Sequence, residues 1–253
     1  MNIDKPKYTQ LPAMRYLWKE AFGDTDDFLD TFFATAFSEE RCRLVTIGEE
    51  VVAALYWFDC MYMNHPVAYV YAVATKEAYR GQGICHKLMD NTREYLKKLG
   101  YAGIVLVPGS KALFDLYESM GFQTCSSIRE IDCNAGTDKI SVEQIDMGEY
   151  QRLRRQYLQA GGVVQEGENL TFLQTMSDFY AGPDFVLAAY TEDNVLHGTE
   201  LLGNANNAPN IVKTFGCEKG SFRTPGEGND FAMYLSLETD ELSAPTYFGL
   251  AFD

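Results

Sequence analysis

Apolar residues at helical spacing dominate the first part of the chain. Residues 11–22 carry such a stripe and stop at Gly23, a residue type that favours helix ends. A second stripe runs to Phe37 after Asp24 or Thr25, either of which can cap the start of a helix. The pattern therefore predicts two consecutive helices.

Extended apolar runs then predict three antiparallel strands, at residues 42–47, 50–58 and 67–75. Gly48-Glu49 predicts a tight hairpin turn between the first two strands, and Asn64-His65-Pro66 predicts the second turn. After the third strand, an apolar stripe from Ile84 to Leu99 predicts a helix that ends at Gly100.

The pattern continues with a strand near residues 104–107, a helix near 110–119 and a strand near 122–132. This order of helices and strands predicts an α+β fold with a mixed sheet. The polar, turn-rich segment Cys133–Asp138 is the best candidate for a domain boundary. We therefore expect two domains, residues 1–136 and residues 137–253.

The second half partly repeats the first. The pattern predicts helices near residues 146–160 and 168–180, and a hairpin turn at Asp193-Asn194. It predicts strands at residues 184–191, 195–203, 209–216, 231–237 and 246–252. The triplet Gly226-Glu227-Gly228 puts an acid where a phosphate would bind. We therefore expect this half to lack a phosphate-binding loop and the helix after it.

In the first half, the segment Arg80-Gly81-Gln82-Gly83-Ile84-Cys85 joins the end of a strand to the start of a helix. The first amides of a helix have no internal partner and lie at the positive end of its dipole. Glycines allow a tight turn and the close approach of an anion, and Arg80 adds a positive charge. The segment therefore suits a pyrophosphate, although it matches neither the dinucleotide fingerprint nor a Walker A loop.

This segment resembles the Arg/Gln-x-x-Gly-x-Gly/Ala signature of the GCN5-related N-acetyltransferases (GNAT). Thr75–Ile84 is similar to the strand, loop and helix of that family throughout, and Ser110–Phe122 resembles a later helix, with Tyr117 and Gly121-Phe122 at the usual spacing.

Two residues depart from the family pattern. Cys85 replaces the final glycine or alanine of the signature, and Glu77 stands where a proline is common. Neither change removes a backbone donor, so we still expect cofactor binding.

The resemblance implies a GNAT fold followed by a degenerate GNAT-like half, as in tandem members that resemble the enhanced intracellular survival acetyltransferases. It implies acetyl-CoA as co-substrate, and a bulge that splays the strand before Arg80, so that free backbone groups bind the pantetheine arm. The predicted cofactor-binding residues are Val73, Ala74, Thr75, Arg80, Gly81, Gln82, Gly83, Ile84, Cys85 and Ser110.

Tyr117 is the predicted general acid, because a phenol close to the sulfur can protonate the leaving thiolate. A core position for Tyr117 and a simple capping role for Ser110 are the alternatives. The general base is not visible in the sequence. Its candidates are Asp59, Glu77 and the C-terminal carboxylate of Asp253, and the first two also fit ordinary surface charges.

Five aromatic residues fit either an acceptor pocket or the core, namely Trp18, Phe28, Phe32, Phe33 and Trp57. The six cysteines and three histidines show no metal-ligand or disulfide spacing, so we expect no metal site.

The net charge of the chain limits the classes of partner that it can bind. The net charge is −15, with 14 basic and 18 acidic residues up to Gly136 and 7 and 18 after it. Phosphate repulsion then disfavours nucleic acid and anionic lipid as partners. No apolar run is long enough for a membrane span, and the default is a cytosolic protein. The oligomeric state stays open.

The sequence therefore predicts an N-acetyltransferase that moves an acetyl group from acetyl-CoA directly to a primary amine in a ternary complex. The acidic second half makes a cationic acceptor, such as a polyamine, an aminoglycoside or a lysine-bearing peptide, a secondary hypothesis. The alternatives are a non-catalytic acyl-CoA-binding or protein-interaction module, and transfer to a hydroxyl or of a longer acyl chain.

Overall fold

The computed structural model describes residues 1–238 and 242–252, and the chain forms two compact units. Unit 1 comprises Met1–Gln123 and Tyr234–Ser243, and unit 2 comprises Thr124–Met233 and Ala244–Asp253. The chain first passes from unit 1 to unit 2 after Gln123, ahead of the boundary predicted at Gly136. The reason is that β6 (Gln123–Asn134) pairs with a strand of unit 2. None of the described helices combines the length and apolar character that a membrane crossing requires.

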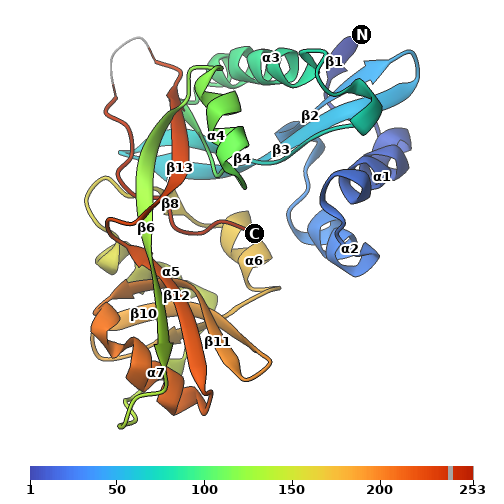
Figure 1. Cartoon of the computed structure of the whole chain (residues 1–253). Helices are drawn as coiled ribbons and strands as arrows, with labels where there is room; N and C mark the ends of the chain where they lie inside the picture. Colours follow the sequence, from blue (N-terminus) through green and yellow to red (C-terminus); the bar gives the residue numbers. More distant parts are fainter. Residues whose placement is uncertain (239–241, 253) are drawn as a thin grey trace. The chain divides into compact units, whose positions relative to one another are not determined.

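The sheet of unit 1 contains five strands in the order of the sequence, followed by the last residues of β13 (Asn229–Ser236). The five strands are β1 (Asn2–Asp4), β2 (Cys42–Ile47), β3 (Glu50–Tyr62), β4 (His65–Thr75) and β5 (Gly103–Leu106). All neighbours among these five are antiparallel except β4 and β5, which are parallel and joined by a helical crossover (Figure 1).

Four α-helices belong to unit 1, namely α1 (Leu11–Phe22), α2 (Asp26–Thr35), α3 (Ile84–Lys98) and α4 (Lys111–Glu118). The predicted signals for the first two helices are confirmed. Gly23 ends α1 with a left-handed φ of 78°, and the Thr25 hydroxyl accepts a hydrogen bond from the Phe28 amide at 3.2 Å. The second predicted turn is shorter than expected, because His65 and Pro66 already belong to β4 and only Met63-Asn64 turn.

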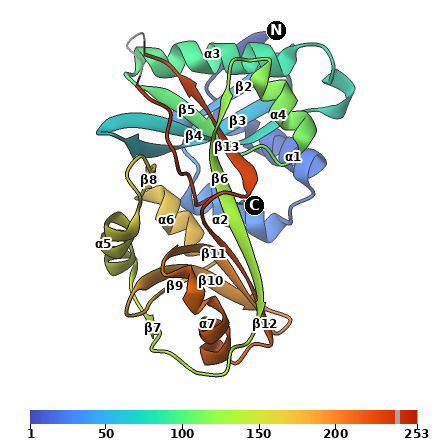
Figure 2. The same ribbon diagram turned by 60° about the vertical axis from the view of Figure 1, so that its left-hand side comes forward.

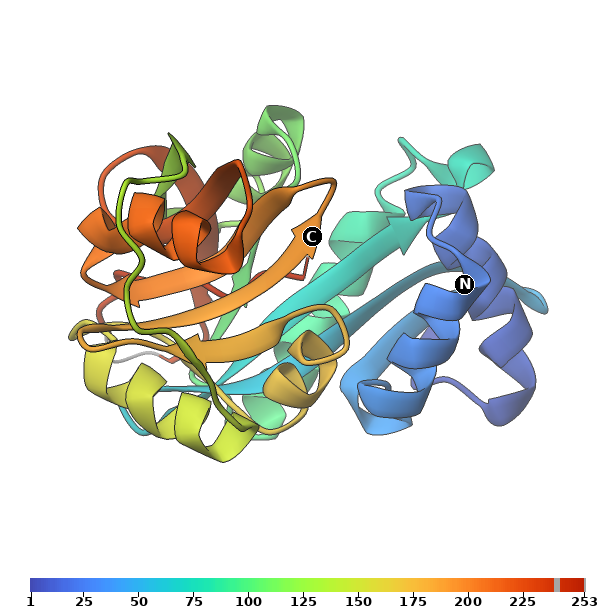
Figure 3. The ribbon, with the colours of Figure 1, turned by 90° about the horizontal axis from the view of Figure 1, so that it is seen from below.

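Helices cover both faces of the unit 1 sheet. Trp18 of α1 packs against Tyr56 of β3 with ring centroids 5.0 Å apart, whereas Tyr95 of α3 packs against Trp57 at 6.1 Å. Successive residues of a strand point to opposite faces. The helix α3 therefore lies on one face, and α1 and α2 lie on the other, as Figures 1 and 3 show.

Unit 2 has a sheet in the order β13, β6, β12, β11, β10, β9, β7. The further strands of this sheet are β7 (Glu143–Gln144), β9 (Asp178–Ala181), β10 (Phe185–Glu192), β11 (Val195–Gly203) and β12 (Lys219–Pro225), and the short strand β8 (Val164–Gln165) lies outside this order. Its helices are α5 (Met147–Tyr157), α6 (Glu168–Leu173) and α7 (Ala208–Phe215) (Figure 2). The predicted turn at Asp193-Asn194 is confirmed, with positive φ at both residues.

Unit 2 repeats the plan of unit 1 more fully than the sequence predicts. Segment 209–216 lies in a helix rather than a strand, and this helix joins the parallel strands β11 and β12 as α3 joins β4 and β5. Pro209 near the helix start and Gly216 in a left-handed C-cap enclose it. The β-branched pair Ile211-Val212, which suggested a strand, is buried against the sheet together with Ala208.

Three other predictions for this half are corrected. The helix expected at 168–180 ends at Leu173, and β9 begins at Asp178. The glycine-rich stretch after Gly216 contains β12. No strand forms at 246–252 among the described residues, where a single bridge joins Gly162 and Tyr247.

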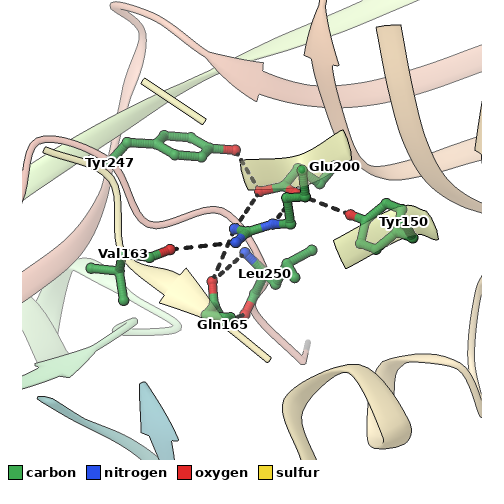
Figure 4. A network of polar contacts seen from close by, with 7 residues as sticks. Tyr150, Val163, Gln165, Glu200, Tyr247 and Leu250 are labelled. Carbon is green, nitrogen blue, oxygen red and sulfur yellow. Dashed lines mark hydrogen bonds and ion pairs between the residues drawn. The ribbon is translucent and has the colours of Figure 1, made fainter. Parts of the chain in front are cut away.

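A buried ion pair in unit 2 explains how segment 246–252 is held without a strand (Figure 4). Arg154 donates two hydrogen bonds to Glu200, at 2.7 and 2.9 Å, and Tyr247 donates to the same carboxylate at 3.0 Å. The Gln165 side-chain amide donates to the Leu250 carbonyl at 2.6 Å and accepts from the Leu250 amide at 3.1 Å. Side chains thus satisfy backbone groups that a neighbouring strand would otherwise bind.

Candidate functional site

The loop between β4 and α3 presents a run of unbonded amides. From Gly81 to His86, no amide donates to an oxygen of the described residues, whereas the Lys87 amide donates to the Gly83 carbonyl at 3.2 Å. Gly83 is the N-cap of α3, and both Gly81 and Gly83 have left-handed φ values, 74° and 71°. A Cβ atom at either glycine would meet nothing within 4 Å. The amides therefore border open space at the positive end of a helix dipole.

The side chains of the loop bond back to its own backbone. Arg80 Nε donates to the Thr75 carbonyl at 3.0 Å, and Gln82 Nε2 donates to the Ala78 carbonyl at 3.2 Å. The Arg80 side chain is thus held beside the amides while the residue remains exposed. A guanidinium in this position adds positive charge to the same anion-binding surface.

A bulge interrupts β4 just before this loop. Tyr71 stands opposite Tyr56 and Ala74 opposite Ala54, so that Ala72 and Val73 share one partner position on β3. Ala72 takes a left-handed φ of 49°, which is uncommon for a residue other than glycine. The bulge predicted from the resemblance is therefore present, and Ala72 is its unusual residue.

The strands β4 and β5 also separate as predicted. Their pairing covers only Val67–Tyr69 of β4, which continues to Thr75. The edge of β4 that includes Val73 and Thr75 thus lacks a strand partner on the β5 side among the described residues. Val73 and Thr75 are half-buried, whereas the Ala74 side chain is buried and leaves only its backbone for a ligand.

Tyr117 lies on α4, with 6% of its surface exposed and its ring centroid 5.7 Å from that of Phe122. Burial raises the pKa of the Tyr117 phenol well above its usual value, and the nearby Cys85 thiol raises it further. Burial likewise raises the pKa of Cys85 to about 11. Cys85 is therefore a neutral thiol near pH 7, although it lies at a helix N-terminus.

One polar contact joins the helix that carries Tyr117 to the helix that follows the loop. His86 Nε2 lies 3.2 Å from Ser119 Oγ, and that hydroxyl donates to the Leu116 carbonyl at 2.6 Å. At the other end of α4, Ser110 is the N-cap residue, but its side chain makes no capping hydrogen bond. Capping by the Ser110 hydroxyl is therefore not its role in this conformation.

The candidate bases differ in their surroundings. Asp59 contacts Arg41 at 3.4 Å and accepts a hydrogen bond from Tyr101. It pairs with Ala68, four residues before Ala72 on β4, which places it about 13 Å from the bulge at ~3.3 Å per residue. Glu77 is exposed beside the loop, and Asp253 lies outside the described residues.

The aromatic candidates separate into two groups. Trp18, Phe28 and Phe32 pack together on one face of the sheet, with Phe33 against Phe32, whereas Trp57 lies on the opposite face. Trp57 therefore cannot share a pocket with the others. Trp18 and Phe32 are buried core residues, and only Phe28 and Phe33 of this group keep part of their surface exposed.

The equivalent loop of unit 2 cannot offer its amides in the same way. The Asn206 amide donates to the Asn204 side chain, and the Asn207 amide donates to the Asn204 carbonyl, both at 3.2 Å. The Ala208 amide donates to the Ala205 carbonyl, and Pro209 has no N–H group. Unit 2 thus keeps the helix but not the unbonded amides.

Sequence reasoning missed three residues that shape the loop. Ala72 carries no sequence signal for its left-handed conformation. Glu20 and Glu50 contact the loop from α1 and β3, and no motif marks them because these contacts depend on the fold.

Comparisons with known proteins bear on the family and the fold. Residues 2–125 match a family model described as an acetyltransferase (GNAT) domain. A search among curated proteins found no match to the sequence.

Several solved structures share the fold. A GCN5-related N-acetyltransferase from Kribbella flavida is 16% identical, with 93% of this chain and 72% of that one covered at a TM-score of 0.71. One from Anabaena variabilis is 14% identical, with 94% and 73% covered at 0.72. Eis1 from Mycobacterium abscessus is 8% identical, with 95% and 75% covered at 0.68. At these identities the likeness concerns the fold.

Proposed function

The N-terminal part of this chain, residues 2–125, belongs to the GNAT acetyltransferase superfamily, and on that premise we propose that the protein transfers an acetyl group from acetyl-CoA to a primary amine. The observation that supports the proposal most directly is the run of unbonded amides from Gly81 to His86 at the start of α3. Such a run binds a diphosphate well, because each amide needs an acceptor and the helix dipole favours negative charge.

In this proposal each part of the site has one task. The amides after Arg80 bind the diphosphate of the co-substrate, and the free edge of β4 binds its pantetheine arm as an added strand would. A backbone amide at the Ala72 bulge donates to the thioester oxygen and stabilises the negative charge that forms during attack. The amine attacks the thioester carbon directly, without a covalent enzyme intermediate.

Tyr117 completes the reaction as general acid. Attack by the amine expels a thiolate, and the Tyr117 hydroxyl donates its proton to that sulfur. The amine loses its own proton to a carboxylate or a water chain, and a proton from solvent restores the Tyr117 hydroxyl. Because its pKa is raised, the Tyr117 phenol holds its proton at neutral pH, which a general acid requires. The contact between His86 and Ser119 holds α4, and with it Tyr117, against the helix that follows the diphosphate loop.

The acceptor is a primary amine, and the charge of the protein favours a cationic one. A net charge of −15 attracts polyamines and other polycations over long distances at low ionic strength. If the charge guides the acceptor, kcat/KM for spermidine falls steeply with added salt while that for a neutral amine does not. Equal kcat/KM for neutral amines and polycations at low salt would contradict this preference.

The experiment that tests the activity measures thiol release from acetyl-CoA across a panel of amines, with calorimetric titration of CoA in parallel. We expect CoA to bind and at least one amine to accelerate thiol release. Binding without release for any amine would favour a non-catalytic acyl-CoA-binding module. Release with alcohols alone would indicate transfer to a hydroxyl.

A further inference from the structure

We propose that Glu50, assisted by Glu20, is a positioning residue that holds the diphosphate loop in its binding conformation. The inference rests on the proposed function, because it assigns a role in coenzyme A binding. Neither carboxylate belongs to the loop, and neither bonds to a predicted cofactor-binding residue or to Tyr117. Glu50 is the first residue of β3, and Glu20 lies in α1.

Glu50 bonds to two residues of the turn that leads into the loop. One of its carboxylate oxygens accepts a hydrogen bond from Lys76 Nζ, and the other accepts one from the Tyr79 hydroxyl at 2.7 Å. Lys76 precedes the 3-10 turn Glu77–Tyr79, Tyr79 is its last residue, and Arg80 follows at once. A single carboxylate thus ties both ends of this turn to the β2–β3 hairpin.

Glu20 bonds to the same turn from another direction. Its carboxylate accepts a hydrogen bond from the Glu77 amide at 2.7 Å. A proline is common at this position in the family that the sequence resembles, and a proline has no N–H group to donate. The departure at Glu77 therefore supplies the donor that Glu20 uses, and α1 takes part in fixing the turn.

These contacts matter because the loop itself contains few internal bonds. Beyond Arg80, the glycines at 81 and 83 add conformational freedom, and their amides donate to nothing among the described residues. Ordering such a segment on binding costs affinity, and a segment that is already ordered avoids that cost. Hydrogen bonds to Lys76, Glu77 and Tyr79 fix the position of the turn that directly precedes the unbonded amides.

Glu50 and Lys76 form an ion pair. The hydrogen bond from Lys76, followed by that from Tyr79, lowers the pKa of Glu50, while the bond to Glu50 raises the pKa of Lys76. Both groups are therefore ionised across the neutral range. The Lys76 ammonium compensates a carboxylate that would otherwise repel a diphosphate.

The test compares Glu50→Gln with Glu49→Gln in the full chain. Glutamine keeps the shape of Glu50 but offers one acceptor oxygen in place of two. Glu49 is its exposed neighbour in the same turn, and its side chain bonds to no described residue, so its variant removes the same charge without the contact. Calorimetry with CoA and kinetics with saturating amine give the readouts.

We expect Glu50→Gln to raise the Kd for CoA and the KM for acetyl-CoA by roughly 3- to 10-fold, because the loop of the variant must be ordered each time the ligand binds. The value of kcat and the melting temperature should stay close to those of the wild type, and Glu49→Gln should match the wild type throughout. Tyr79→Phe removes one hydroxyl from the same contact, so its effect on Kd should not add to that of Glu50→Gln.

Three results would overturn the inference. Wild-type affinity in both Glu50→Gln and Tyr79→Phe would show that the loop needs no such support. An equal loss in Glu49→Gln would assign the effect to charge alone. A fall in kcat at unchanged Kd would place Glu50 elsewhere in the reaction. If the wild type itself fails to bind CoA, the proposed function fails first, and the inference fails with it.

Discussion

At the scale of single residues, both the backbone conformation and the surroundings of position 83 favour a glycine. Its φ is left-handed, and the space where a Cβ would stand is open. An alanine there meets a modest backbone cost of about 1 kcal/mol and places a methyl group where we expect the diphosphate. The sequence shows the need for a glycine here, because the Gly-x-Gly spacing before a helical stripe is typical of a loop that approaches an anion closely.

We predict that Gly83→Ala weakens CoA binding at least tenfold and changes the melting temperature only slightly. Gly100→Ala is the matched control, because Gly100 also has a positive φ and open space but follows the far end of α3. Calorimetry separates the two variants. Similar affinities would remove Gly83 from the binding site.

Tyr117 can be tested by the loss of one hydroxyl. Tyr117→Phe keeps the ring that packs against Phe122, so we expect the fold and the CoA affinity to persist. The loss of a general acid should lower kcat by about 10²-fold. Steady-state kinetics with the best amine decide the matter, and unchanged turnover would leave Tyr117 as a core residue.

The protonation of Tyr117 also leads to a prediction of pH dependence. Burial disfavours the charged phenolate and raises its pKa, so the proton stays on the hydroxyl throughout the alkaline range used for assays. We expect kcat to show no decline between about pH 7 and 9.5. A fall across that range that disappears in Tyr117→Phe would contradict the raised pKa.

At the scale of elements, prediction succeeded where a local signal marks an end. Gly23 and Thr25 carry such signals, and the helices begin and end beside them. Prediction failed at α7, because Ile211-Val212 has strand propensity and the contacts that favour a helix come from the sheet beneath it. Segment 246–252 also looks like a strand, but the Gln165 side chain binds its backbone instead.

The buried pair in unit 2 leads to a prediction about stability. Arg154 and Glu200 are almost fully buried, so removing one charge leaves the other without its partner in a poorly solvated place. We expect Glu200→Gln to lower the free energy of unfolding by about 3 kcal/mol. Urea denaturation measures this loss.

The double variant Arg154→Met/Glu200→Leu provides the contrast, because it leaves no unpaired charge. It should lie closer to the wild type than Glu200→Gln does. If the double variant is the less stable of the two, the ion pair itself stabilises the unit.

At the scale of the whole chain, the sequence pattern predicts two halves that follow one another, whereas each compact unit contains two segments. The segment Tyr234–Ser243 completes unit 1, where the Leu237 amide donates to the Ala102 carbonyl at 2.8 Å. The ring of Tyr234 also lies where a side chain at Gly103 would stand. Contacts between residues so distant in sequence leave no local trace in the pattern, which explains why the predicted boundary at Gly136 differs.

We therefore predict that a fragment of residues 1–136 does not fold stably. It lacks the residues that cover Gly103 and bond to Ala102 beside β5, and it exposes an apolar edge. Circular dichroism and size-exclusion chromatography of the fragment check this result. A soluble fragment with a cooperative melt and full CoA affinity would show that residues 234–243 are dispensable.

The late position of Tyr234 has a consequence for biosynthesis. Residues that border β5 leave the ribosome long after β5 itself, so unit 1 waits, incomplete, until Tyr234 and its neighbours emerge. Its exposed edge must stay soluble during that interval. Vectorial synthesis thus leaves unit 1 unfinished until after most of unit 2 has been made, although most of the sequence of unit 1 is made first.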